Sequence, residues 1–286
     1  MRGFSLKSLH NLKWPGIIRT IFAFAAGMFL LDGAILITPS TPAADDGRVI
    51  LCMKWGTKYG PEYVNRLYAM VRRHLRGDFR FVCLTDRSEG VRAEVECLPI
   101  PDLKLPEGLP ERGWKKLTTF EADLHGLRGT ALFLDLDVVI TDSIDCFFEQ
   151  PGQFLIIHDW KRPWRVTGNS SVYRFKLGAH ADVLAQFRAT QAEARKAFRN
   201  EQAYLSDVLH KQGKLDYWPA DWCCSYKYHC IPRWPLNYWR EPRVPAGTRI
   251  VIFHGEVNPP DALEGRRNRA FRFVKRAPWI ADHWRE

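Results

Sequence analysis

Short apolar runs and amphipathic stretches alternate along the chain from residue 48 onward. Apolar runs bounded by Gly and Pro are typical of buried strands, whereas apolar positions three and four residues apart are typical of helices. We therefore expect strands over residues 48–54, 79–86, 94–100, 130–140, 153–159, 171–177 and 249–255. We expect helices over residues 61–75, 114–124, 179–198 and 201–212. This alternation predicts an α/β fold with a mixed, mostly parallel sheet flanked by helices.

The N-terminal residues 1–47 have a different pattern. Residues 17–37 are almost entirely apolar, follow several basic residues and include Asp32. A helix of that length would cover about 31 Å, enough to span a bilayer. Three interpretations stay open: a single membrane anchor, a signal sequence cleaved near Ala43 or Ala44, and an extension with neither role. An anchor would make the protein membrane-associated; otherwise we expect it in the cytoplasm.

Composition limits the classes of protein and partner. The 286 residues include 11 Trp, 17 Phe and 9 Tyr, which is too much aromatic surface for a disordered chain. The formal net charge of +10 predicts an anionic partner, but no nucleic-acid-binding module is recognisable, so we expect no nucleic acid. The seven cysteines lack the spacing of a disulfide framework. We expect one domain over residues 48–262, followed by a basic tail over residues 263–286.

Two aspartates interrupt the strand predicted over residues 130–140. In FLDLDVVIT (133–141), Asp135 and Asp137 are two positions apart and would share one face of the strand. Two carboxylates so close together repel each other unless a cation neutralises them. Mn²⁺ or Mg²⁺ would suit the pair, because these ions take oxygen ligands and leave positions for substrate phosphates. The alternative without a ligand is a strand end whose aspartates cap the next loop.

Two classes of enzyme use such an Asp pair at the end of a strand. In phosphatases of the haloacid-dehalogenase type, the first Asp is the nucleophile and the second a general acid or base. That strand usually lies near the start of the domain. In nucleotide-sugar glycosyltransferases of the GT-A type, the pair follows the nucleotide-binding half. Here a long stretch of α/β pattern precedes Asp135, and this placement favours a glycosyltransferase.

Residues 48–262 resemble bacterial glycosyltransferases related to family 8, the group of glycogenin and the lipopolysaccharide galactosyltransferases. The matching segments follow the order of that family: GWKKL (113–117), FLDLDVVIT (133–141), GNSSVYRFKLG (168–178), NEQAYLS (200–206) and VIFHGEVNPP (251–260). The resemblance implies a GT-A-like fold for these residues, and the apolar run over 17–37 predicts a hydrophobic helix in front of it. The resemblance also implies transfer of a sugar, with retention, from a nucleotide-sugar donor (UDP-linked by analogy) to a glycan or lipid-linked acceptor.

The resemblance assigns metal and donor contacts to named residues. Asp135 and Asp137 would bind Mn²⁺ or Mg²⁺ together with the ribose and diphosphate of the donor. His254 would be the third protein ligand of the metal. Lys116, or its neighbour Lys115, would contact the phosphate or the sugar of the donor.

The resemblance assigns the remaining site residues and shows two departures from the family. Asn169 would contact the sugar or the acceptor, while Glu201 and Gln202 would lie beside the anomeric carbon as the catalytic pair. Glu201 replaces an Asp of the family, and Asn258 replaces a Lys that would neutralise the leaving diphosphate. Lys227, or an Arg of the basic tail, would supply that charge instead. These departures keep open a non-catalytic sugar-binding relative as an alternative.

Overall fold

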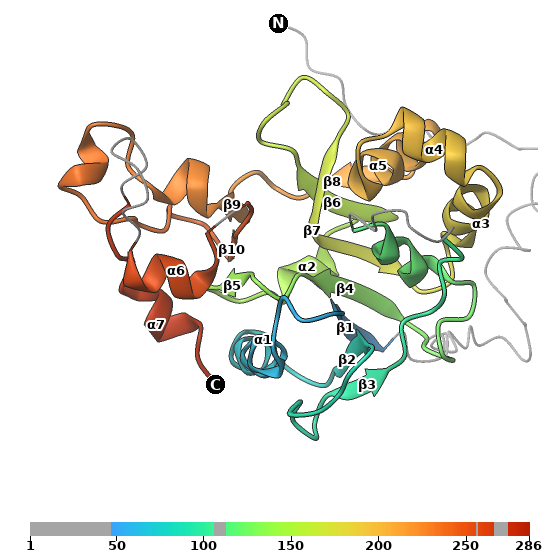
Figure 1. Cartoon of the computed structure of the whole chain (residues 1–286), viewed down its shortest axis with the longest axis horizontal. Coiled ribbons are helices and arrows are strands. Elements are labelled where there is room, and N and C mark those ends of the chain that lie inside the picture. Colours follow the sequence, from blue (N-terminus) through green and yellow to red (C-terminus); the bar gives the residue numbers. More distant parts are fainter. Residues whose placement is uncertain (1–46, 106–112, 256, 266–273) are drawn as a thin grey trace, which may run out of the picture. The chain divides into compact units, whose positions relative to one another are not determined.

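The computed structural model describes residues 47–105, 113–255, 257–265 and 274–286 (Figure 1). The hydrophobic segment predicted over residues 17–37 lies outside this part. Among the described residues, no helix has both the length and the apolar character that a membrane span needs. The described residues belong to one compact unit that ends at Glu286 and includes residues 263–265 and 274–286 of the predicted basic tail.

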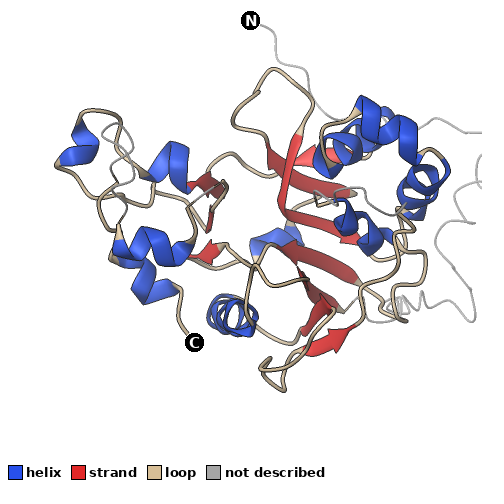
Figure 2. Ribbon diagram, in the orientation of Figure 1, coloured by secondary structure: helices blue, strands red, loops and turns tan. Residues whose placement is uncertain are grey.

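A seven-stranded sheet forms the centre of this unit (Figure 2). Its strands are β1 (Arg48–Lys54), β2 (Arg80–Thr85), β3 (Glu96–Leu98), β4 (Thr130–Leu134), β6 (Phe154–His158), β7 (Gly168–Lys176) and β8 (Leu215–Tyr217). The order is β3-β2-β1-β4-β7-β6-β8. Every neighbouring pair is parallel except the two that involve β7. The predicted mixed, mostly parallel sheet is confirmed.

Both faces of the sheet are buried, as the continuous apolar runs predict. In β1, Ile50 and Cys52 point into one hydrophobic core, while Val49 and Leu51 point into a second core on the opposite face. The first core includes α1 (Pro61–His74). The second core is covered by the 3₁₀ helix η1 (Trp114–Phe120), α3 (Ala181–Ala189), α4 (Gln191–Ala197) and α5 (Glu201–Lys211) (Figure 1).

A small second sheet lies beside the first core. It contains β5 (Val139–Ile140), β10 (Ile250–Ile252) and β9 (Cys223–Ser225), in that order. Ala277, Ile280 and Trp284 are buried in the same core, so the end of the predicted tail is part of the folded unit. The remaining helices are α2 (Cys146–Glu149), the π-helical turn η2 (Tyr226–Cys230), η3 (Leu236–Tyr238), α6 (Pro259–Glu264) and α7 (Trp279–His283).

Three predicted elements differ from the structure. The strand predicted over 130–140 ends at Leu134, and the chain then turns and enters the second sheet as β5. The helix predicted over 114–124 is a 3₁₀ helix that ends at Phe120. The helix predicted over 179–198 is interrupted at Thr190, whose hydroxyl donates a hydrogen bond of 2.8 Å to the Gln186 carbonyl oxygen and so competes with the helical backbone.

Candidate active site

Asp135 and Asp137 lie in the turn that leads from β4 to β5. This turn is at the C-terminal ends of the parallel strands β1 and β4, the usual position of ligand sites in α/β sheets. The two carboxylates do not share one face of a strand, as was predicted, because the strand ends before them. They still interact: burial raises the pKa of Asp137 from 3.8 to about 6, and the Asp135 charge acts in the same direction.

Lys116, on η1, provides a counter-charge for Asp135. Its Nζ lies 2.6 Å from Asp135 Oδ1 and donates a hydrogen bond of 3.3 Å to the Ser170 carbonyl oxygen. Burial alone would lower the pKa of this ammonium group, but the Asp135 and Glu201 carboxylates outweigh it, and the pKa is raised. Lys116 therefore stays charged. Of the two lysines that the resemblance offered, it is the one placed at the aspartate pair.

Tyr59 holds the other aspartate. Its hydroxyl donates a hydrogen bond of 2.7 Å to Asp137 Oδ2 and lies 3.4 Å from Asn258 Oδ1. Burial, followed by the charge of Asp137, raises the pKa of Tyr59, so the phenol keeps the proton that it donates. Tyr59 was not among the site residues predicted from the sequence. The available signal was its place in the loop after the first predicted strand, at the edge where Asp137 also lies.

The N-terminal end of β7 meets the first turn of α5. Ser170 Oγ donates a hydrogen bond of 2.7 Å to Glu201 Oε1, and Ser170 N donates one of 3.3 Å to Gln202 Oε1. Glu201 is buried. The side chain of Asn200 accepts a hydrogen bond from the Ala203 backbone N–H and caps the helix. The predicted pair Glu201–Gln202 is thus held at one end of the sheet, and Glu201 affects Lys116 electrostatically.

Asn169, Gln202 and His254 line one pocket of about 670 Å³. A volume of this size is typical of small-molecule sites. The Asn169 side-chain oxygen accepts a hydrogen bond of 3.0 Å from the Ser171 N–H, and the Gln202 side-chain oxygen is also engaged, by Ser170. In the described part of the chain, neither amide NH₂ has a partner. Both groups are available as hydrogen-bond donors to a molecule in the pocket.

His254 interacts with the segment that follows β9. Its Nε2 lies 2.6 Å from Ser225 Oγ, and its ring is 6.2 Å from the Trp160 ring, nearly parallel to it. Burial lowers the pKa of His254 to about 4, and the positive charges of Lys161 and Lys227 act in the same direction. Lys227 is exposed and lies beside Tyr228. The imidazole is therefore neutral at physiological pH.

Solved structures match this arrangement of strands and helices. The galactosyltransferase LgtC, in complex with donor and acceptor sugar analogs, is 13% identical; the match covers 74% of this chain and 88% of that chain, with a TM-score of 0.53. The chain has the fold of a glycosyltransferase. The apo structure of the bifunctional glycosyltransferase WbbM is 11% identical, and the match covers 76% of this chain but 47% of that one, with a TM-score of 0.51.

These likenesses show the fold alone, because the identities are so low. No family model and no curated protein matches the chain. The relation to family 8 therefore stays a prediction. LgtC and WbbM are glycosyltransferases, as the resemblance implied, and neither gives support to the phosphatase alternative.

The aspartate pair fits a divalent cation, but the predicted third ligand is not beside it. Lys116 and Tyr59 each engage one carboxylate oxygen, and the second oxygen of each aspartate has no hydrogen bond within the described residues. Two hard oxygen ligands would leave positions for substrate phosphates. Within the same residues, no three His, Cys, Asp or Glu side chains are grouped closely enough to hold a metal ion. The role of His254 as a metal ligand stays a prediction.

Proposed function

We propose that this chain transfers a sugar from a nucleotide-sugar donor, UDP-linked, to a glycan or lipid-linked acceptor, with a divalent cation and with retention of configuration. The supporting observation is the aspartate pair at the carboxyl edge of the sheet, held by Lys116 and Tyr59 beside a pocket that presents unpaired amide donors. The glycosyltransferase fold supports the same proposal.

The charges of the site suit the loss of a nucleoside diphosphate. Cleavage of a glycosyl–phosphate bond leaves an oxocarbenium-like sugar and an anionic leaving group, which must be stabilised. Asp135 and Asp137 would hold Mn²⁺ or Mg²⁺, and the bound cation would supply Lewis-acid charge to the leaving diphosphate. Lys116 and Tyr59 orient the two carboxylates, so the ligand oxygens are in place before the donor binds.

Gln202 and Glu201 have different parts in this proposal. The Gln202 NH₂ group lines the pocket and would donate a hydrogen bond to the sugar. Glu201 is buried and accepts a hydrogen bond from Ser170, so it acts as a positioning residue for Lys116 instead of contacting the sugar. Asn169, which lines the same pocket, would donate to the sugar or the acceptor. No side chain is assigned as a covalent nucleophile.

Calorimetric titration of UDP into the full chain, with and without Mn²⁺, tests the proposal. We expect micromolar binding that requires Mn²⁺ and is lost in Asp137→Asn, which keeps the shape of the side chain but not its charge. Asp78→Asn is the matched control, because Asp78 is exposed and precedes β2 at the opposite edge of the sheet. Absence of UDP binding by folded wild-type protein would refute the proposed donor. The anomer released by donor hydrolysis, followed by NMR, tests retention.

A further inference from the structure

Four cationic side chains line the pocket beside Asn169 and Gln202. Lys161, Arg162 and Arg165 come from the loop that joins β6 to β7, and Arg199 precedes α5. All four residues are exposed. Within the described part of the chain, none of these four side chains forms an ion pair or a hydrogen bond. Their charges are therefore available to a ligand, unlike that of Lys116, which is engaged by Asp135.

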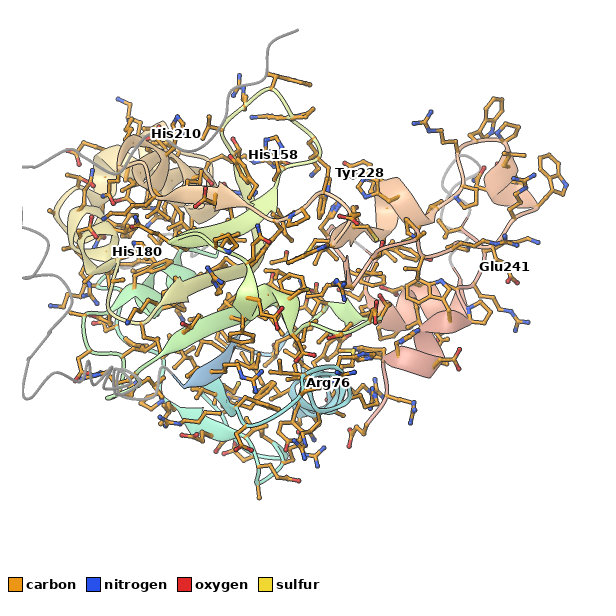
Figure 3. The ribbon with its side chains drawn as sticks, turned by 180° about the vertical axis from the view of Figure 1, so that it is seen from behind. Arg76, His158, His180, His210, Tyr228 and Glu241 are labelled. Atoms are coloured by element: carbon orange, nitrogen blue, oxygen red, sulfur yellow. The ribbon has the colours of Figure 1, made fainter. Side chains whose placement is uncertain are left out.

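The loop that carries three of these cations has an ordered backbone. The Asp159 N–H donates to the Thr167 carbonyl oxygen at 3.0 Å and closes the loop, while the Arg165 N–H donates to the Arg162 carbonyl oxygen at 2.9 Å. At the base of the loop, His158 Nε2 lies 3.3 Å from the Arg165 carbonyl oxygen. Figure 3 marks His158, where the loop begins. The cations are thus presented from a defined turn.

The acidic groups of the pocket are already engaged. Asp159 Oδ1 accepts a hydrogen bond of 3.0 Å from the backbone N–H of Lys161. Asp207 forms an ion pair of 2.7 Å with Lys211 on the next turn of α5. Neither carboxylate contacts the four cations. With four cations against two carboxylates in its lining, the pocket keeps an excess of positive charge.

The neutral polar groups of the pocket add to this bias. Asn169 and Gln202 use their side-chain oxygens internally and present NH₂ groups. The N-terminus of α5 adds positive potential to the pocket, because Asn200, its N-cap, and Gln202, in its first turn, line the pocket. A neutral sugar offers hydroxyl groups that need both donors and acceptors. A wall of donors and unpaired cations matches an oxyanion better.

We propose that the acceptor of this transferase is anionic, and that a phosphate or carboxylate on it is recognised by Lys161, Arg162, Arg165 and Arg199. This inference rests on the proposed function, because it assigns the cation-lined part of the pocket to the acceptor. Guanidinium groups bind phosphate and carboxylate with the same two-pronged geometry, so the shared chemistry is an oxyanion. The preference for an anionic acceptor depends mainly on the loop between β6 and β7, which carries three of the four cations, and not on the aspartate pair.

The test titrates glucose 6-phosphate, glucuronate and glucose into the full chain saturated with UDP and the diamagnetic Mg²⁺, followed by ligand-observed NMR. We expect at least one charged sugar to bind about tenfold more tightly than glucose, and the stronger of the two identifies the anion. Replacement of Arg162 and Arg165 together by Gln should weaken its binding about threefold to tenfold, because it removes two of the four cations that give the preference. Arg76→Gln, outside the pocket and well below His158 in Figure 3, should leave it unchanged.

Two results would overturn the inference. Equal affinity for the charged and neutral sugars would show that the pocket does not select an oxyanion. A loss of UDP affinity in the Arg162/Arg165 variant as large as the loss for the charged sugar would show that the cations serve the donor. If UDP does not bind wild-type protein at all, the proposed function fails, and the same three sugars titrated without UDP still report the preference of the pocket.

Discussion

Replacement of Asp137 by Asn should stabilise the metal-free protein while it abolishes donor binding. The pKa of this carboxyl is raised in the folded state, so its ionisation opposes folding. Asn keeps the acceptor oxygen for the Tyr59 hydroxyl but carries no charge. The substitution thus removes the unfavourable burial of a charge and keeps the hydrogen bond from Tyr59. A gain in stability with a loss of function is expected where residues of a functional site destabilise the fold.

The size of this stabilisation and its dependence on pH follow from the pKa of Asp137 in the unfolded and folded states. The pKa of this carboxyl is 3.8 in the unfolded chain and about 6 in the folded protein. Its ionisation therefore lowers the free energy of unfolding by up to about 3 kcal/mol once the pH exceeds both values. Below pH 3.8 both states are protonated, and the variant and the wild type should be equally stable. The advantage of the variant should be about 1 kcal/mol at pH 4.5 and about 3 kcal/mol at pH 7.5.

Urea unfolding followed by tryptophan fluorescence, in EDTA and at several pH values, measures this difference. The control Asp78→Asn should change the free energy of unfolding by less than about 0.5 kcal/mol at every pH, as is usual for an exposed side chain. A variant that is less stable than the wild type, or whose advantage does not grow between pH 4.5 and 7.5, would show that Asp137 is not destabilised by burial and by Asp135.

Three further substitutions test the contacts around this centre. Lys116→Met leaves Asp135 and Glu201 without their counter-charge and should cost about 3 kcal/mol in urea unfolding; no loss would mean that the ion pair is dispensable. Tyr59→Phe should weaken Mn²⁺-dependent UDP binding about fivefold through loss of one hydrogen bond to a charged group, and unchanged calorimetric affinity would contradict this. Asn200→Ala should lower the free energy of unfolding by about 1 kcal/mol through loss of the α5 cap, whereas Asn200→Ser should restore most of it.

Local patterns were sufficient to predict most of the sheet. The run RVILCMK matches β1 over its whole length, and the apolar spacing of residues 61–75 matches α1 apart from its last residue. Both signals depend on neighbouring side chains and on which faces are buried, and this information is contained in a short window of sequence. The Asp135–Asp137 pair was identified for the same reason, since two charges in an apolar run are visible without the fold.

The partners of these aspartates could not be predicted from local sequence. Tyr59 is separated from Asp137 by 78 positions, and Ser170 lies 54 positions from Lys116. The order of the strands brings these residues together, because β1, β4 and β7 are neighbours in the sheet although they are not consecutive in the chain. The apolar pattern also predicted one strand over residues 130–140, because β4 and β5 are both apolar. That they belong to two different sheets is visible only in the structure.

The sequence by itself thus determined the α/β class, the mostly parallel sheet and the aspartate pair, because each depends on residue type and short-range periodicity. Only the tertiary structure decided that Lys116 and Tyr59 hold those carboxylates, that His254 is bound to Ser225, and that the cations of the β6–β7 loop face a pocket. The physical reason is that side-chain charges act over a few ångströms in space, and distances in space are set by strand order and loop closure.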